Sequence, residues 1–237
     1  MKSWRGLRSR LRQAREAPQP NGGSRGTPQH AGGLSFRVEE RLPAPAKGAG
    51  PREAFLYFDL ETTGLGARHW VFLCGCLFYQ QGELYLCQEV AADFCDERHM
   101  LVRFTELAGR YPRLVSFNGR SFDAPMLRRR LAYHGLPPLR FENIDLLPVV
   151  RRRFRERLED CRLVTVEREI LGICRESGDI PGAEVPLRFL DYKESGERRL
   201  LDPVLYHNRM DLTTLEALHG HLAENFEEVG GQRSGVR

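Results

Sequence analysis

The chain has 237 residues, of which 41% are hydrophobic and 29% are charged, a composition typical of a globular protein that buries a core. No apolar run approaches the roughly 20 residues of a membrane-spanning helix, and the first residues lack the apolar segment of a secretory signal. We therefore expect neither a membrane protein nor a secreted one. Residues 1–50 carry ten of the 36 Lys and Arg residues and three of the 32 Asp and Glu residues, so the net charge of +4 divides into +7 there and −3 in the remainder.

The first 52 residues are interpreted as a basic leader. They are rich in Arg, Gly, Pro, Gln and Ser, and a stretch such as "PQPNGGSRGTPQHAGG" buries too little apolar surface to offset the entropy lost on ordering. We predict disorder over 1–52, one domain over 53–226 and a flexible tail over 227–237. The stretch "WRGLRSRLRQAREA" resembles a short basic helix. Contact with nucleic acid or anionic lipid, a transit peptide and a solvated tail all remain open for it.

The six cysteines form no metal-binding or disulfide pattern. The sequence has no CxxC pair and no Cys/His set with zinc-ligand spacing. Cys74 and Cys76 lie in the apolar run "VFLCGCLFY" and are interpreted as buried free thiols. Free thiols suit a reducing compartment, so we expect a cytoplasmic protein.

The elements after Ala54 alternate between short strands and helices. Strands are predicted over 54–60, 71–79 and 83–90, and the link "QQGE" makes the last two an antiparallel hairpin. Next come a helix in "ERHMLVRFTELAGRY", a strand in "RLVSFN", a helix in "SFDAPMLRRRLAYHG" and a strand in "FENIDLL". Further helices are expected near 147–158, 162–173, 186–194 and 202–224. This order resembles the ribonuclease-H-like layout, an α/β fold with a mixed five-stranded sheet flanked by helices.

Acidic residues recur at three places in this layout. Residues i and i+2 of a strand point to the same face, so Asp59 and Glu61 in "FDLETTGL" are expected side by side. Asp123 begins a helix in "VSFNGRSFDAPML", and Asp211 lies on the last helix in "VLYHNRMDLTTLEAL". Each acid alone also has a structural interpretation, such as a strand-end cap or a first-turn helix acid. Four converging carboxylates would need positive charge, and Mg²⁺ and Mn²⁺ prefer such oxygen ligands.

The three acidic segments resemble the motifs of DEDD-type 3′–5′ exonucleases, the group that includes polymerase proofreading domains; they read "FDLETTG", "FNGRSFD" and "HNRMD". A closer resemblance is to the YprB-type ribonuclease-H-like branch, through "CRLVTVEREILG", "GDIPG" and "VLYHNRMDLTTL", over roughly residues 54–222. The resemblance implies hydrolysis of phosphodiester bonds with two Mg²⁺ or Mn²⁺ ions. It also implies that Asp59 bridges both ions, that Glu61 and Asp211 complete the shell of one, and that Asp123 holds the other largely through water.

The family also has a residue before the last aspartate that activates the attacking water. One subgroup has Tyr four residues before that Asp and the other has His five before it. Here His207 is four before Asp211 and Tyr206 is five before it. Residues four apart share a helix face, whereas five apart turn away by about 140°. Because the pKa of histidine is also nearer neutrality, we predict His207 as the general base, with Tyr206 second.

Four residues near the acids are candidate substrate contacts. By resemblance, Gly64 and Leu65 fall where the 3′-terminal nucleotide lies over the backbone, although a turn glycine and a core leucine would give the same sequence. Thr62 either bonds that nucleotide or ends the strand, and Asn118 either contacts substrate or a metal-bound water or shapes its turn. We expect a single-stranded 3′ end of a nucleic acid, because a narrow site admits an unpaired terminus. The choice between DNA and RNA stays open.

Two arginine-rich stretches and one further acid have alternative interpretations. The arginines of 151–157 either follow a phosphate backbone or form a solvated face paired with Glu156, Glu159 and Asp160, and the pairing is favoured. Those of 128–130 either approach the substrate strand or stay solvated. Asp145 is interpreted first as a helix cap or structural support and second as a further acid of the site.

Three rival functions follow from the same residues. A non-catalytic nucleic-acid-binding module is one, because a fold does not fix a function, although the full acid set favours an enzyme. A structure-specific endonuclease of the same fold is another. A phosphatase with an aspartyl nucleophile is disfavoured, because such enzymes typically have Asp two residues after the first and here that residue is Glu61.

Overall fold

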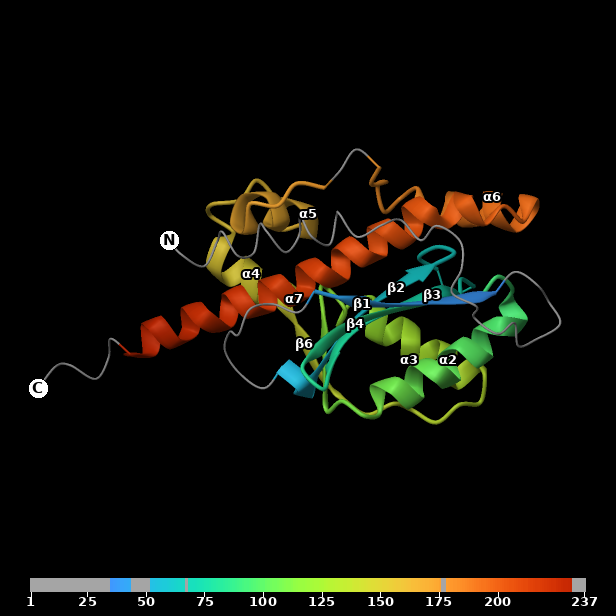
Figure 1. Ribbon diagram of the computed structural model, residues 1–237, viewed down its shortest axis with the longest axis horizontal. Helices are drawn as coiled ribbons and strands as arrows, with labels where there is room; N and C mark the ends of the chain where they lie inside the picture. Colours follow the sequence, from blue (N-terminus) through green and yellow to red (C-terminus); the bar gives the residue numbers. More distant parts are fainter. Residues whose placement is uncertain (1–34, 44–51, 67, 176–177, 232–237) are drawn as a thin grey trace, which may run out of the picture.

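The computed structural model of the chain describes residues 35–43, 52–66, 68–175 and 178–231. Its centre is a mixed sheet in the order β1-β4-β3-β2-β5-β6 (Figure 1). The strands are β1 (Phe36–Leu42), β2 (Phe55–Thr62), β3 (Val71–Gln80), β4 (Glu83–Val90), β5 (Arg113–Ser116) and β6 (Glu142–Asp145).

The five predicted strands are present and pair as the ribonuclease-H-like layout requires. β2, β3 and β4 form an antiparallel meander, while β5 runs parallel to β2 and β6 parallel to β5. The turn from β3 to β4 is made by Gln81 and Gly82, both with positive φ (53° and 77°), which suits the twist of a tight hairpin. The predicted α/β fold class is therefore confirmed.

The predicted count of five strands is wrong, because part of the predicted leader forms β1. In "FRVEERL" the residues alternate between half-buried and exposed, and Leu42 is buried at the end of the strand. β1 pairs antiparallel to β4 from Phe36↔Val90 to Leu42↔Leu84. A short alternating strand of this kind is masked by the Gly- and Pro-rich composition around it. The rest of the leader, residues 1–34 and 44–51, lies outside the described residues.

The helices follow the prediction with shifted ends. They are α2 (Phe94–Ala108), α3 (Asp123–Tyr133), α4 (Leu146–Phe154), α5 (Leu163–Val166), α6 (Val185–Ser195) and α7 (Asp202–Gly231), with short turns η1 (Arg52–Ala54), η2 (Glu167–Leu171) and η3 (Arg198–Leu201). The helix predicted over 162–173 divides into α5 and the π-helical turn η2, which ends at Gly172 in a left-handed conformation (φ 64°). α7 continues past the predicted domain end at residue 226, and residues 232–237 lie outside the described part.

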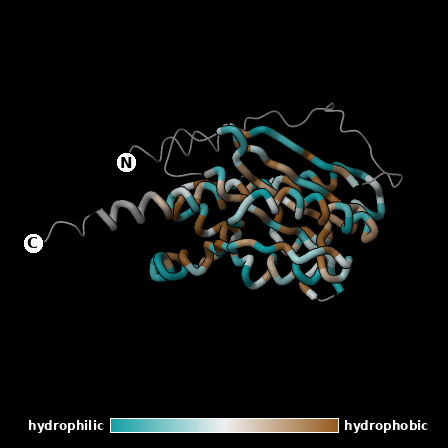
Figure 2. The backbone as a smooth tube through the Cα atoms, turned by 90° about the horizontal axis from the view of Figure 1, so that it is seen from below, coloured by the Kyte–Doolittle hydropathy of each residue, from teal (hydrophilic) through white to brown (hydrophobic). Residues whose placement is uncertain are grey.

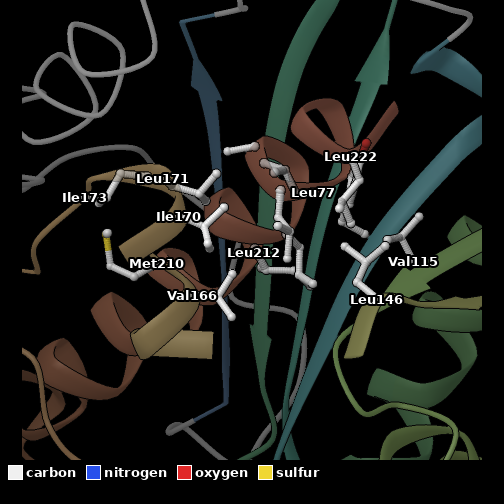
Figure 3. Packing of buried hydrophobic residues seen from close by; sticks show 14 of the residues in the cluster. Leu77, Val115, Leu146, Val166, Ile170, Leu171, Ile173, Met210, Leu212 and Leu222 are labelled. Atoms are coloured by element: carbon white, nitrogen blue, oxygen red, sulfur yellow. The ribbon is translucent and has the colours of Figure 1, made fainter. Parts of the chain in front are cut away.

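The sheet is covered on both faces. α4, α5 and α7 pack on one face, where Leu146, Val166 and Met210 join Leu77 and Val115 in one cluster (Figure 3). α2 and α3 cover the other face, and α6 packs at the ends of β3 and β4. Hydrophobic stretches run mainly through the interior and hydrophilic ones mainly through outer turns (Figure 2). Within the described ranges, no helix is long and apolar enough to cross a bilayer.

Candidate functional site

β2 presents Asp59 and Glu61 on the same side, as the alternation predicts. Both are half-buried, whereas Phe58, Leu60 and Thr62 between and beside them are buried on the opposite side. The pairing of β2 with β3 shifts register between Glu61 and Thr62. The two carboxylates therefore lie at the end of the strand, where the sheet becomes irregular.

The loop after β5 brings Asp123 to the same strand. Asp123 is the first residue of α3 and is buried (5% exposed). Its Oδ1 accepts a hydrogen bond from the backbone N–H of Leu60 at 3.2 Å. Because Leu60 lies between Asp59 and Glu61, this bond brings the third acid to the first two.

α7 contributes the fourth acid and the predicted base. His207 Nε2 lies 3.7 Å from Asp211 Oδ2, so the two side chains share one face of the helix. Asn208 Nδ2 donates to Asp59 Oδ2 at 2.8 Å, which ties this turn of α7 directly to β2. Tyr206, the second candidate base, is half-buried against the hydrophobic cluster of α4, α5 and α7.

Asn208, which the sequence interpretation missed, is held in one orientation. It is fully buried, and its Oδ1 accepts from Gln88 Nε2 at 2.9 Å. Because its oxygen is used there, its amide nitrogen must face Asp59. A Cβ on Gly75 of β3 would lie 2.1 Å from Asn208 Oδ1, so glycine leaves the space for this amide. The only feature of the sequence that pointed to Asn208 was its position next to His207.

Arg175 and Asp179, in the segment after η2, also reach the site and were not predicted. Arg175 ion-pairs with Asp211, donates to Asp179 Oδ2 at 3.0 Å and donates to Glu167 Oε2 at 2.7 Å. His207 Nδ1 lies 2.9 Å from Asp179 Oδ1. The guanidinium is 7% exposed, so one buried cation neutralises part of a strongly acidic cluster.

The acids perturb one another. Burial, followed by the charges of Asp211 and Asp123, raises the pKa of Asp59 well above its ordinary value. Burial and then the charge of Asp59 do the same to the pKa of Glu61. Burial raises the pKa of Asp123 to about 7, even though the Leu60 N–H favours its ionised form. The site therefore carries more negative charge than the protein alone accommodates.

The donor set fits hard divalent cations. All four predicted ligands are carboxylates, and a dication would stabilise the ionised forms that burial and then mutual repulsion disfavour in Asp59, Glu61 and Asp123. In the described part of the chain, no three His, Cys, Asp or Glu side chains are yet arranged closely enough to hold a metal ion. Asn208, the Leu60 N–H and Arg175 each hold one of the carboxylates, Asp59, Asp123 and Asp211 respectively.

The predicted substrate contacts border the acids. Thr62 is buried and its Oγ1 donates to the carbonyl of Gly64 at 2.9 Å. Gly64 has φ +150°, and an added Cβ would lie 2.5 Å from the ring of His69. Leu65 is 83% exposed, which argues against a core leucine. Asn118 is exposed with φ 63°, so it shapes its turn.

Asp145 caps α4, as interpreted. It accepts hydrogen bonds from the backbone N–H of Leu147 at 3.0 Å, of Asn118 at 2.8 Å and of Arg120 at 3.1 Å. It therefore fixes the loop that precedes Asp123.

Arg130 of the second arginine stretch is structural. It is buried and donates to Glu97, also buried, at 2.8 Å. The interpretation that Arg130 approaches a substrate strand is therefore wrong. Arg129 is half-buried and donates to the carbonyl of Gly66 at 3.4 Å, while Arg128 is exposed.

The sheet order and the acids at the end of β2 define a ribonuclease-H-like protein. The chain belongs to the RNase H superfamily, whose family model matches residues 56–223. It is 34% identical over 184 residues to the uncharacterized protein YprB of Bacillus subtilis (strain 168), across 76% of this chain and 44% of YprB. The domain is thus of the YprB type.

Two DNA polymerases are also similar to the chain. DNA polymerase 1 of Aeropyrum pernix is 27% identical over 135 residues, which cover 48% of this chain and 14% of the polymerase. The family B DNA polymerase of Pyrobaculum calidifontis shares the fold with a TM-score of 0.58 at 18% identity, over 80% of this chain and 29% of the polymerase. The chain spans less than half the length of the curated relatives it matches.

Proposed function

We propose that this chain is a metal-dependent 3′–5′ exonuclease that acts on single-stranded ends of nucleic acids. The observation that carries the proposal is the gathering of Asp59, Glu61, Asp123 and Asp211 from β2, α3 and α7, where burial and the neighbouring charges raise the pKa values of Asp59, Glu61 and Asp123. Such mutually repelling carboxylates are typical of a site that functions with bound cations. The match to a DNA polymerase supports a nucleic-acid substrate.

The four acids would hold two Mg²⁺ or Mn²⁺ ions. Bound there, the ions would stabilise the charge that develops on the phosphate and acidify the attacking water. Asn208 keeps Asp59 oriented by donating to one of its oxygens. Arg175 keeps Asp211 in place in the same way and reduces the repulsion between the acids.

His207 is the proposed general base, positioned by Asp179. A proton on Nδ1 donated to Asp179 leaves Nε2 as the acceptor, on the side of Asp211. Nε2 takes a proton from water, whose oxygen attacks the phosphorus of the last phosphodiester as the bond to the 3′ oxygen breaks, and the leaving 3′ oxygen takes a proton from solvent. The products are a nucleoside 5′-monophosphate and a strand shortened by one nucleotide with a new 3′-hydroxyl.

The loop after β2 is proposed to receive the terminal nucleotide. The exposed side chain of Leu65 and the backbone at Gly64 border the acids, and the buried Thr62 supports this loop through its bond to Gly64. Asn118, in the loop before Asp123, remains a candidate contact. Tyr206 remains the second candidate for the base.

Labelled oligonucleotides test the proposal. Single-stranded DNA and RNA 20-mers labelled at the 5′ end would be incubated with Mg²⁺, with Mn²⁺ or with chelator. We expect a metal-dependent ladder that shortens from the 3′ end, absent in Asp211→Asn and retained in the control Asp191→Asn, an exposed acid on α6. Circular single strands separate the alternatives, since only an endonuclease cuts them. Metal-dependent cleavage that survives in Asp211→Asn, or no cleavage of any substrate, would refute the proposal.

A further inference from the structure

The end of α4 and the turn after it carry a concentrated positive charge. The stretch 151–157 contains five arginines and one acid, Glu156, a net charge of +4. Arg151, Arg152, Arg155 and Arg157 are exposed. We call these four residues the α4 arginine surface.

The acids expected to neutralise this surface are engaged elsewhere. Glu159 accepts from Arg168 Nη2 at 2.8 Å, and Asp160 accepts from Arg162 Nε at 2.6 Å. Among the described residues, the side chains of Arg151, Arg152 and Arg155 make no hydrogen bond or ion pair, while Arg157 lies over the ring of Phe154. The predicted pairing with Glu159 and Asp160 is therefore wrong: both acids line one hollow with Arg151 and Arg155 but form their ion pairs with Arg168 and Arg162.

The helix that carries the α4 arginine surface begins at the loop that leads to Asp123. Asp145, the N-cap of α4, holds the N–H groups of Asn118 and Arg120 in the loop that leads to Asp123. At 1.5 Å per helical residue, Arg151 lies about 9 Å and Arg155 about 15 Å along the helix from this cap.

α4 also lies on the same face of the sheet as the base and the fourth acid. Its inner residues Leu146 and Val150 belong to the hydrophobic cluster that includes Met210, one residue before Asp211. Figure 1 accordingly shows α4 beside α5 on the α7 side of the sheet. A hollow of about 500 Å³ next to Arg151 and Arg155 makes this surface concave, and Leu158, Glu159, Asp160 and Cys161 also line it.

We propose that the α4 arginine surface binds the phosphodiester backbone of the single strand whose 3′ end occupies the acidic site. This inference rests on the proposed function and adds the path of the strand. A stacked strand rises about 3.4 Å per nucleotide along its axis, so the 9–15 Å from the cap of α4 corresponds to roughly three to five nucleotides along the strand. Guanidinium groups bind phosphate oxygens in pairs, and unpaired arginines need no prior ion pair to be broken.

The test compares two triple variants of equal charge. In one, Arg151, Arg152 and Arg155 are changed to Gln; in the other, the exposed arginines Arg98, Arg110 and Arg140, located on α2, after it and before β6, are changed to Gln. Both are made in the Asp211→Asn background, so that oligonucleotides stay intact. Binding of fluorescent dT and U 20-mers and trimers is measured over a range of salt concentrations, and melting curves confirm folding.

The first triple variant is expected to bind the 20-mers at least tenfold more weakly at low salt, with less than about threefold loss in the control. Each lost phosphate contact reduces the slope of log K against log salt by about 0.7, so the slope should fall by about 2. The trimers, too short to reach this surface, should show less than about twofold loss.

The outcomes separate the two proposals. Equal 20-mer affinity in both triple variants overturns the arginine surface, and hydrolysis by the wild type can then still stand. Weakened binding in the first triple variant without any hydrolysis by the wild type supports the surface but refutes the exonuclease. If no oligonucleotide binds the background chain, the arginine surface is refuted, and hydrolysis by the wild type decides the exonuclease separately.

Discussion

Replacement of Asp123 by Asn should stabilise the metal-free protein at alkaline pH. Asn is close in size to Asp, and its Oδ1 can still accept the hydrogen bond from the Leu60 N–H, which is 3.2 Å long in the wild type. The Asn side chain is uncharged, however, and so does not repel the other acids. The carboxyl proposed to hold a metal ion therefore costs stability whenever no cation is bound.

The sign and size of this effect follow from the pKa of Asp123. Burial raises it from 3.8 to about 7, so the folded state disfavours the ionised carboxylate. The resulting loss of stability begins as the pH rises through 3.8 and is complete above about 7. A difference of about three pKa units at 1.36 kcal/mol each gives up to about 4 kcal/mol at pH 8 and under about 2 kcal/mol at pH 5.

Urea denaturation in the presence of chelator measures this difference. With a urea m-value of about 2 kcal/mol/M, the midpoint of Asp123→Asn should lie up to about 2 M above that of the wild type at pH 8, and much less at pH 5. Asp191→Asn, an exposed acid on α6, is the control and should shift by less than about 0.3 M. A pH-independent shift, or a destabilised Asp123→Asn at pH 8, would refute the reasoning.

Two further predictions concern the residues that position the site. Gly75→Ala places a Cβ 2.1 Å from Asn208 Oδ1, so we expect a loss of about 1–3 kcal/mol in urea denaturation and at least tenfold weaker Mn²⁺ binding in calorimetry; unchanged Mn²⁺ affinity would contradict this. Asp179→Asn should lower kcat about tenfold with little change in KM, and should cause no further loss in a His207→Ala background, since it acts through that ring. Independent, multiplicative losses in the double variant would show that Asp179 has another role.

Much of the fold could be predicted because its signals are local. Strand alternation, the hairpin turn at Gln81 and Gly82 and helical periodicity define β2 to β6 and the main helices without tertiary information. β1 was missed because its seven residues lie in a segment whose overall composition favours disorder. Its stability comes from pairing with β4, far along the chain, which no local pattern reports.

In the candidate site, too, some residues had a signal in the sequence and others depended on contacts between distant parts of the chain. Asp59 and Glu61 could be predicted at the end of a strand and Asp123 at the start of a helix, while Asp211, inside α7, was predicted from the resemblance of its motif. The residues that orient these acids could not be predicted. Asn208 depends on Gln88 of another strand, and Arg175 reaches the site from an irregular segment without periodicity.

The arginine stretch of 151–157 shows how proximity in sequence misleads. Neighbouring acids suggested ion pairs, but Glu159 and Asp160 turn toward Arg168 and Arg162 instead. The direction in which a side chain points determines its ion-pair partner. In a turn, closeness in sequence does not determine that direction.

The most direct test of the central claim, that the acids of β2, α3 and α7 form a divalent-metal site, is Mn²⁺ binding by calorimetry at pH 8. The account predicts two ions per chain in the wild type, and at least tenfold weaker binding in Asp59→Asn, whose side chain is common to the expected ligand sets. The Asp191→Asn control should bind like the wild type. Absence of Mn²⁺ binding at millimolar concentration, or unchanged binding in Asp59→Asn, would contradict the claim whatever the substrate of the protein.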